Sequence, residues 1–131
     1  MASGKIHSLG DAPARGDQER MLKMLLSQLD AMVYRCRDDE FWTMEFVSEG
    51  CRAITGYRPE DLLFNSRISY EEVIHPDDRT RVRAAVRDAI AAQRRFDVSY
   101  RILRPDGAVR WVSERGGGVF APDGKFLRTI E

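Results

Sequence analysis

The 131-residue sequence contains only two cysteines, carries no net charge and lacks a long apolar run. Cys36 and Cys51 stand alone, without the close spacing of a metal site. We interpret them as buried thiols in a reducing cytoplasm rather than as a disulfide or a redox switch. The 21 basic and 21 acidic side chains cancel, so the overall charge does not favour a nucleic-acid partner. No apolar stretch approaches the roughly 20 residues of a transmembrane helix, which argues against direct membrane insertion.

The sequence also lacks the patterns that accompany catalysis. It has no nucleophile paired with a base at a recognisable spacing, no Walker loop and no cluster of metal ligands. The glycines at 116–118 lie inside a predicted strand with no helix after them, so we interpret them as a bulge or a place of close backbone approach rather than a phosphate-binding loop. We therefore predict that this chain is not an enzyme and has no catalytic residue and no metal site.

What is present is the composition of one globular domain. Hydrophobic residues make up 43% of the chain and charged residues 32%, as in ordinary folded proteins, and the length allows one core but not two. Residues 1–16 are rich in small residues without periodicity, and we predict a flexible leader there. We assign residues 17–30 to a separate N-terminal helix and residues 31–131 to the folded domain, with its last strand truncated.

The N-terminal helix is predicted to be amphipathic. Asp17 can cap it, and apolar residues follow at helical spacing. Four apolar residues fit the a and d positions of a short heptad seam, and they are the candidate dimer interface: Leu22, Leu25, Leu29 and Met32. Such a helix either covers its own sheet or pairs with a second copy of the chain, and the sequence leaves both arrangements open.

Two short strands are predicted next, over residues 32–37 and 41–48. In the second strand, alternation places Trp42, Met44 and Phe46 on one face, which we assign to the interior. A stripe of this kind is either packed core or the wall of a ligand site.

Short helices are predicted to follow, and a longer helix comes after them. Gly56 is placed to end the first short helix, and Pro59 and Pro76 suit the first positions of later helices, where an N–H is not needed. The longest helix carries an apolar stripe formed by Val82, Ala85, Val86, Ala89 and Ile90. Its arginines lie elsewhere on the helix, and we interpret them as a solvated face rather than a binding patch.

From Arg95 onward, three antiparallel strands joined by two near-identical turns are predicted. The turns are Arg-Pro-Asp-Gly at 104–107 and Ala-Pro-Asp-Gly at 121–124. In each, proline presets φ, aspartate can bond its own backbone, and glycine can adopt the positive φ that closes a hairpin. With the two upstream strands, they predict an α+β fold: a five-stranded antiparallel sheet with helices over one face, preceded by the amphipathic helix.

Three groups of residues follow one another in a distinctive order. They are Thr55-Gly56-Tyr57 followed by Pro59-Glu60-Asp61-Leu62, then His75-Pro76-Asp77-Asp78-Arg79, and then Tyr100-Arg101 through Asp106-Gly107 to Arg110-Trp111-Val112. Each group is weak evidence alone, but their order and spacing together resemble a PAS domain, in the variant whose second half is called the PAC motif. The resemblance runs from Ala31 to Glu131.

The resemblance implies a sensory module of a multidomain bacterial signalling protein, of the histidine-kinase or cyclic-di-nucleotide enzyme type. A small ligand would bind in the cleft between sheet and helices, and the signal would leave through the last strand to a C-terminal effector in the same chain. The candidate cleft walls are Trp42, Met44, Phe46, Tyr100 and Trp111. The alternative is a ligand-free module that forms a homodimer through the N-terminal helix and the outer sheet face.

The resemblance does not identify a cofactor. In this family a covalent flavin adduct requires a cysteine in a pattern similar to Asn-Cys-Arg-Phe-Leu-Gln. The matching stretch here is Asn65-Ser66-Arg67-Ile68, and serine cannot form the adduct. Haem binding usually uses a histidine on or near the long helix, and residues 77–93 contain none. Both cofactors are disfavoured, while a non-covalent small molecule remains open.

Overall fold

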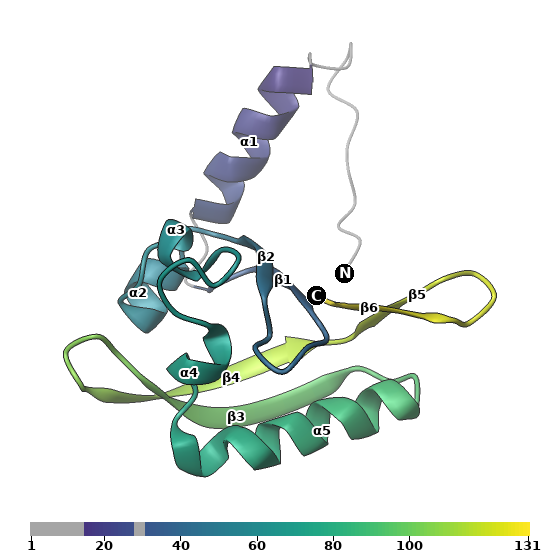
Figure 1. The fold of residues 1–131 in the computed structure, drawn as a ribbon. Helices are drawn as coiled ribbons and strands as arrows, with labels where there is room; N and C mark the ends of the chain where they lie inside the picture. The colour runs from purple at the N-terminus through teal and green to yellow at the C-terminus, as the bar shows by residue number, and fades with distance from the viewer. Residues whose placement is uncertain (1–14, 28–30) are drawn as a thin grey trace.

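The computed structural model describes residues 15–27 and 31–131, and it confirms the predicted α+β class (Figure 1). Antiparallel strands and short helices alternate with one long helix. In chain order the elements are α1 (Arg15–Ser27), β1 (Tyr34–Arg37), β2 (Met44–Val47), α2 (Cys51–Thr55), α3 (Pro59–Leu62), α4 (Tyr70–Val73), the 3-10 turn η1 (Pro76–Asp78), α5 (Arg79–Ala91), β3 (Phe96–Leu103), β4 (Val109–Gly116), β5 (Gly118–Phe120) and β6 (Phe126–Ile130).

The strands form two antiparallel groups instead of the single five-stranded sheet that the sequence predicted. One group has the order β2-β1-β6-β5, and the other is the β3-β4 hairpin. The predicted middle strand of the meander is split at Gly117, whose backbone N–H and C=O both pair with Glu131 at 3.0 Å. A Cβ at Gly116 would lie 2.7 Å from the Phe96 ring and from the Tyr34 hydroxyl. The prediction of close backbone approach at these glycines is confirmed.

The two Asp-Gly turns have the predicted chemistry. Gly107 has φ of 85° and Gly124 has φ of 88°. In the first turn the Asp106 carboxylate accepts from the backbone N–H two residues on at 2.9 Å, and Asp123 does the same in the second. The β3-β4 and β5-β6 hairpins are therefore closed by local interactions that the sequence shows directly.

The first two strands are shorter than predicted, and the side-chain pattern of β2 changes along its length. Met44 and Val47 are buried, while Phe46 is 42% exposed. The β1-β2 register is interrupted between Arg35 and Cys36, so that Arg35 lies opposite Phe46 but Cys36 lies opposite Met44. This bulge adds one residue to the β2 side and reverses the facing of the residues beyond it. The prediction that Phe46 points inward was therefore wrong.

Helix α5 packs along β3 through its predicted apolar stripe, in which Val82, Val86 and Ala89 are buried (Figure 1). The arginines of this helix do more than form a solvated face. Arg83 is only partly exposed, and its guanidinium donates to the carbonyl oxygens of Asp39 and Glu40. It also forms an ion pair of 2.8 Å with the carboxylate of Glu71 on α4. The Arg83 guanidinium thus connects α5 to the β1-β2 loop.

Before α5, Asp78 fixes the start of the helix against β3. Its carboxylate accepts from the backbone N–H of Arg101 at 2.8 Å and from the guanidinium of the same residue at 2.7 and 3.0 Å. These bonds hold the pKa of Asp78 well below its usual range. Its main partner is therefore Arg101.

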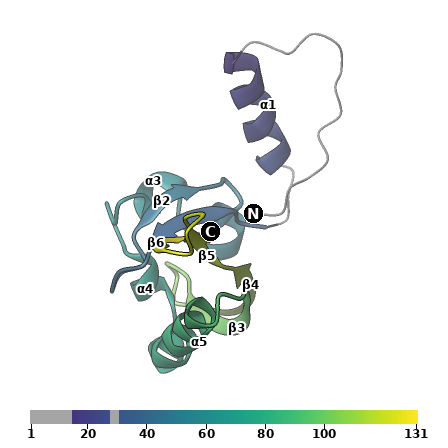
Figure 2. The same ribbon diagram turned by 90° about the vertical axis from the view of Figure 1, so that its right-hand side faces the viewer.

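Helix α1 projects away from the remaining elements, as the two orthogonal views show (Figures 1 and 2). Leu22 and Leu25 lie on it and are 57% and 52% exposed. Met32 lies beyond the end of α1, is partly buried and packs against the domain core, so the heptad seam does not extend to it on this helix. Leu29, the fourth candidate, lies outside the described residues. Within 15–27 and 31–131, no helix is long and apolar enough to cross a membrane.

Candidate functional site

A cavity of about 520 Å³ lies within the domain, bordered by the inner side of the β3-β4 hairpin, by β1, β2, α4 and α5, and by the end of β6. This volume falls in the range of small-molecule sites. The side chains that matter for the argument below are Tyr34, Trp42, Tyr70, Phe96, Tyr100 and Glu114.

The structure brings together three of the five predicted wall residues. Trp42, Met44 and Tyr100 are at most 5% exposed and all line the cavity. Trp111 reaches only its rim, because it is 65% exposed and lies opposite Arg101, whose guanidinium stands 5.7 Å from the indole centroid. Phe46 does not line the cavity, because the β1-β2 bulge turns its side chain outward. That any of these residues contacts a ligand stays a prediction.

The most distinctive group in the cavity wall is the half-buried carboxyl of Glu114 with three linked tyrosines, which we call the Glu114 cluster. Tyr34 donates to one carboxylate oxygen of Glu114, and Tyr100 donates to the other at 2.6 Å. The Tyr70 hydroxyl lies 2.7 Å from the Tyr100 hydroxyl. The cluster therefore joins β1, α4, β3 and β4 through side-chain hydrogen bonds at the cavity.

Sequence reasoning missed this cluster, although a partial indication was present. Glu114 shares its side of β4 with Val112, on the face that also carries Tyr100 across the hairpin. The alternation therefore places a carboxylate on an inward face. However, 80 residues separate Tyr34 from Glu114 and 30 separate Tyr70 from Tyr100. No local pattern could show that two phenols meet one acid and that a third phenol meets one of them.

Burial dominates the electrostatics of the Glu114 cluster. It raises the pKa of Glu114, while the hydrogen bonds from Tyr100 and Tyr34 act in the opposite direction. Burial also raises the pKa of the Tyr34, Tyr70 and Tyr100 hydroxyls. The phenols consequently remain neutral donors near neutral pH, and Glu114 is the group of this cluster that can change charge.

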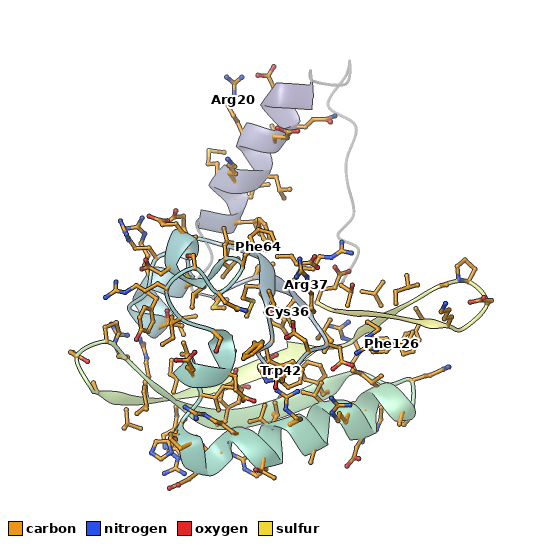
Figure 3. The ribbon with its side chains drawn as sticks, viewed as in Figure 1. Arg20, Cys36, Arg37, Trp42, Phe64 and Phe126 are labelled. Atoms are coloured by element: carbon orange, nitrogen blue, oxygen red, sulfur yellow. The ribbon has the colours of Figure 1, made fainter. Side chains whose placement is uncertain are left out.

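Trp42 differs from an ordinary core tryptophan in two respects. Its backbone has φ of 54°, a conformation that costs energy for a bulky side chain. Its indole Nε1 is buried and has no acceptor among the described residues. The Arg83 guanidinium lies 4.0 Å from the ring centroid, and Figure 3 shows Trp42 between the β1-β2 region and α5. Trp42, a residue of the cavity wall, therefore carries a buried hydrogen-bond donor without a partner among the described residues.

Both cysteines are free and buried, as predicted. Burial raises the pKa of Cys51 to about 11 and also raises that of Cys36, so both thiols stay protonated and poorly reactive near neutral pH. Cys36 lines the cavity. Across the described part of the chain, no three metal-ligating side chains come together to form a metal site.

The raised pKa of Glu114 predicts a pH-dependent stability. Above the ordinary glutamate pKa of about 4.3, the unfolded chain has released a proton that the folded chain still holds. Because the unfolded state then binds fewer protons, the free energy of unfolding should fall as pH rises through this window. Glu114→Gln removes the titration, so the stability of the natural chain relative to this variant should decrease with rising pH.

Urea unfolding followed by circular dichroism, in steps from about pH 4.5 to pH 8, measures this difference. Glu40→Gln is the matched control, because it makes the same change at an exposed site outside the cavity wall. A constant difference for Glu114→Gln would show that this carboxyl has an ordinary pKa.

Comparison with known proteins agrees with the motifs and the fold. A family model described as the PAS fold matches residues 44–131. The chain belongs to the PAS family. The resemblance predicted from the motifs is thus confirmed, and the Glu114 cluster lies in the interior of a PAS domain.

One curated relative and two solved structures illustrate the similarity. The methyl sulfide methyltransferase-associated sensor of Methanosarcina acetivorans is 37% identical over 110 residues, which are 83% of this chain and 11% of that protein. A sensory box histidine kinase/response regulator from Burkholderia thailandensis is 28% identical with a TM-score of 0.61, covering 83% of this chain and 79% of that one. The PAS domain of a Colwellia psychrerythraea protein has a TM-score of 0.64 at 18% identity, covering 84% and 92%.

Proposed function

We propose that this PAS domain is the signal-input module of a larger signalling protein and that its cavity binds a small ligand. The observation that carries the proposal is the cavity of about 520 Å³, whose wall contains a hydrogen-bonded buried acid and an unpartnered indole N–H. A core that served packing alone would gain stability by replacing these polar groups with apolar ones. A ligand that uses them gives a reason for their presence.

Two similarities support a sensory role. The Methanosarcina relative is named a sensor, and the Burkholderia structure belongs to a sensory box histidine kinase/response regulator. The chain spans only 11% of the length of the Methanosarcina relative. In this proposal residues 31–131 form the sensory unit, and catalysis belongs to an effector outside it.

The structure provides a short path from the cavity to the last strand. Two residues after Glu114, Gly116 lies close to the Tyr34 hydroxyl. The next residue, Gly117, exchanges backbone hydrogen bonds with Glu131, which comes directly after β6. Tyr34 is also the first residue of β1, which pairs with β6. A ligand that changes the Glu114 cluster would therefore act on the pairing of β1 and β6, through which we propose the signal leaves.

Native mass spectrometry of the purified protein, with an ultraviolet-visible spectrum of the same sample, tests ligand binding. We expect a mass excess that is lost on collisional activation, or absorbance beyond that of the aromatic residues. Gentle and denaturing spray conditions distinguish a bound molecule from a covalent change. A bare polypeptide mass under gentle conditions in material from several expression hosts would contradict the proposal.

A second candidate function is a homodimerisation module that uses α1. The observation in its favour is the set of apolar side chains on the projecting helix, in which Leu22 and Leu25 are spaced i, i+3 and more than half exposed. A second copy of the same helix would cover both leucines with matching apolar groups.

Leu25→Asp tests this dimer, because it would bury a charge in the seam. If the dimer exists, its dissociation constant should rise at least about tenfold in sedimentation experiments, equivalent to about 1.4 kcal/mol. Lys23→Gln on the same helix changes the charge by the same amount and should leave the dissociation constant unchanged. A dimer that survives Leu25→Asp would have its interface elsewhere.

A further inference from the structure

We propose that the ligand of this cavity is a small organic cation whose protonated nitrogen pairs with Glu114 and whose oxygen acceptor receives the Trp42 indole N–H. The inference rests on the proposed ligand-binding function and specifies its chemistry. It follows from the hydrogen-bond pattern of the acid, the charges around the cavity, the aromatic wall and the unpartnered donor.

The first argument is the way in which Glu114 is held. Tyr34 donates to one of its oxygens and Tyr100 donates to the other. Burial raises the pKa of Glu114, and a cation bound beside the carboxyl would instead favour its ionised form. A carboxylate has about four acceptor positions, and the two phenols occupy two of them. Since Glu114 also lines the cavity, acceptor positions remain for a donor that enters there.

The second argument is charge. Besides Glu114, the charged residues in the described cavity wall are Arg110 and Arg115, and both are exposed and directed to other partners. Arg110 donates to the carbonyl oxygen of Ala53 at 2.6 Å, and Arg115 pairs with Asp97 at 3.2 Å. The buried carboxylate therefore has no buried cationic partner in the wall, and a bound cation would compensate it.

The third argument is the aromatic wall. Tyr34, Tyr70, Phe96 and Tyr100 border the cavity, and the faces of such rings attract cations, most strongly where water is excluded. Trp42 also borders the cavity, but Arg83 already lies over its ring. A carboxylate enclosed by aromatic rings favours a cation over a neutral ligand and disfavours an anion. Apolar parts of the same ligand would pack against the rings.

The fourth argument concerns Trp42 and is independent of the acid. Trp42 is only 5% exposed, and its Nε1 has no acceptor among the described residues. A buried donor without a partner costs about 1–3 kcal/mol. Nε1 has less than 1 Å² of accessible surface, so an acceptor oxygen on the ligand would recover this cost once the indole turned toward the cavity. The ligand is therefore an amine that also carries a hydroxyl, ether or carbonyl oxygen.

Three probes that share a phenol ring and differ in charge test the inference. They are tyramine, which is cationic, p-ethylphenol, which is neutral, and p-hydroxyphenylpropionate, which is anionic at neutral pH. In isothermal titration calorimetry on the whole chain, we expect tyramine to bind at least about tenfold more tightly than p-ethylphenol, with the anion weakest.

Variants then assign the preference to named groups. Glu114→Gln should raise the dissociation constant of tyramine at least about tenfold and change that of p-ethylphenol by less than about twofold. Glu40→Gln removes the same charge at an exposed site outside the cavity wall, and should change the binding of neither probe. Trp42→Phe keeps an aromatic ring but removes the N–H, and it should weaken the binding of both tyramine and p-ethylphenol. It provides a test of the donor contact if Glu114→Gln does not fold by circular dichroism.

Three results would overturn the inference: anionic probe binding equal to that of tyramine, unchanged tyramine binding in Glu114→Gln, or no binding by any probe. Native mass spectrometry separates this failure from failure of the proposed function. A retained molecule that is not an amine would leave the sensor function intact and remove the amine class. Absence of both a retained molecule and probe binding would remove both.

Discussion

Replacing Tyr100 with alanine is expected to lower the free energy of unfolding by about 3–5 kcal/mol. Tyr100 is 1% exposed and belongs to the domain core, so the truncation leaves a space that its neighbours cannot fill. It also removes the donor to one oxygen of Glu114 and a partner of Tyr70. The change combines lost burial with lost hydrogen bonds, which makes it the largest effect that we expect.

Tyr100→Phe separates the two contributions, because it keeps the ring and removes only the hydroxyl. We expect it to cost about 1–3 kcal/mol, the usual effect of leaving a buried polar group without its partner. Urea unfolding of both variants, followed by circular dichroism at a fixed pH, measures the two values. If Tyr100→Phe is as stable as the natural chain, the hydroxyl contributes nothing, and the Glu114 cluster is not a cooperative network.

The second large effect is expected for Ile102→Ala, which should lower the free energy of unfolding by about 2–5 kcal/mol. Ile102 is fully buried on the inner face of β3 and forms a backbone bridge with Ile74 at the end of α4. Removing its side chain creates a space where the hairpin meets the short helices. Because Ile102 does not line the described cavity, this loss should reduce stability without changing the charge preference of the ligand site.

Val109→Ala is the control for this substitution. Val109 belongs to the same hairpin, paired with Leu103 next to Ile102, but is 53% exposed. We expect Val109→Ala to change the free energy of unfolding by no more than about 0.5 kcal/mol, as substitutions at most surface positions do. Equal costs for Ile102→Ala and Val109→Ala would indicate that the inner face of β3 is not the core of this domain.

The parts of the fold that local chemistry controls were predictable. The φ values of Gly107 and Gly124 are positive because each glycine takes the left-handed position that ends a three-residue Pro-Asp-Gly loop. The stripe that contains Val82 and Val86 is buried because helical periodicity places these residues on one face. These features depend on residues within a few positions of one another, so the sequence contains all the information needed.

The candidate site was only partly predictable. Trp42, Met44 and Tyr100 were expected in the cavity wall and are found there, since alternation along a strand identifies one face. Phe46 obeys the same pattern in the sequence but points outward, because the β1-β2 bulge breaks the alternation. A bulge is a property of the pairing between two strands, and neither strand shows it alone.

The sequence by itself thus determined the fold class, both Asp-Gly turns, the long helix and membership of the PAS family. Only the tertiary structure decided that the middle strand of the meander divides at Gly117, and that Glu114 meets Tyr34 and Tyr100 inside a cavity. The physical reason is the range of the interactions. Turns, caps and periodicity act over a few residues, whereas Glu114 gains its hydroxyl partners only when β1 and β3 lie beside β4 in the fold.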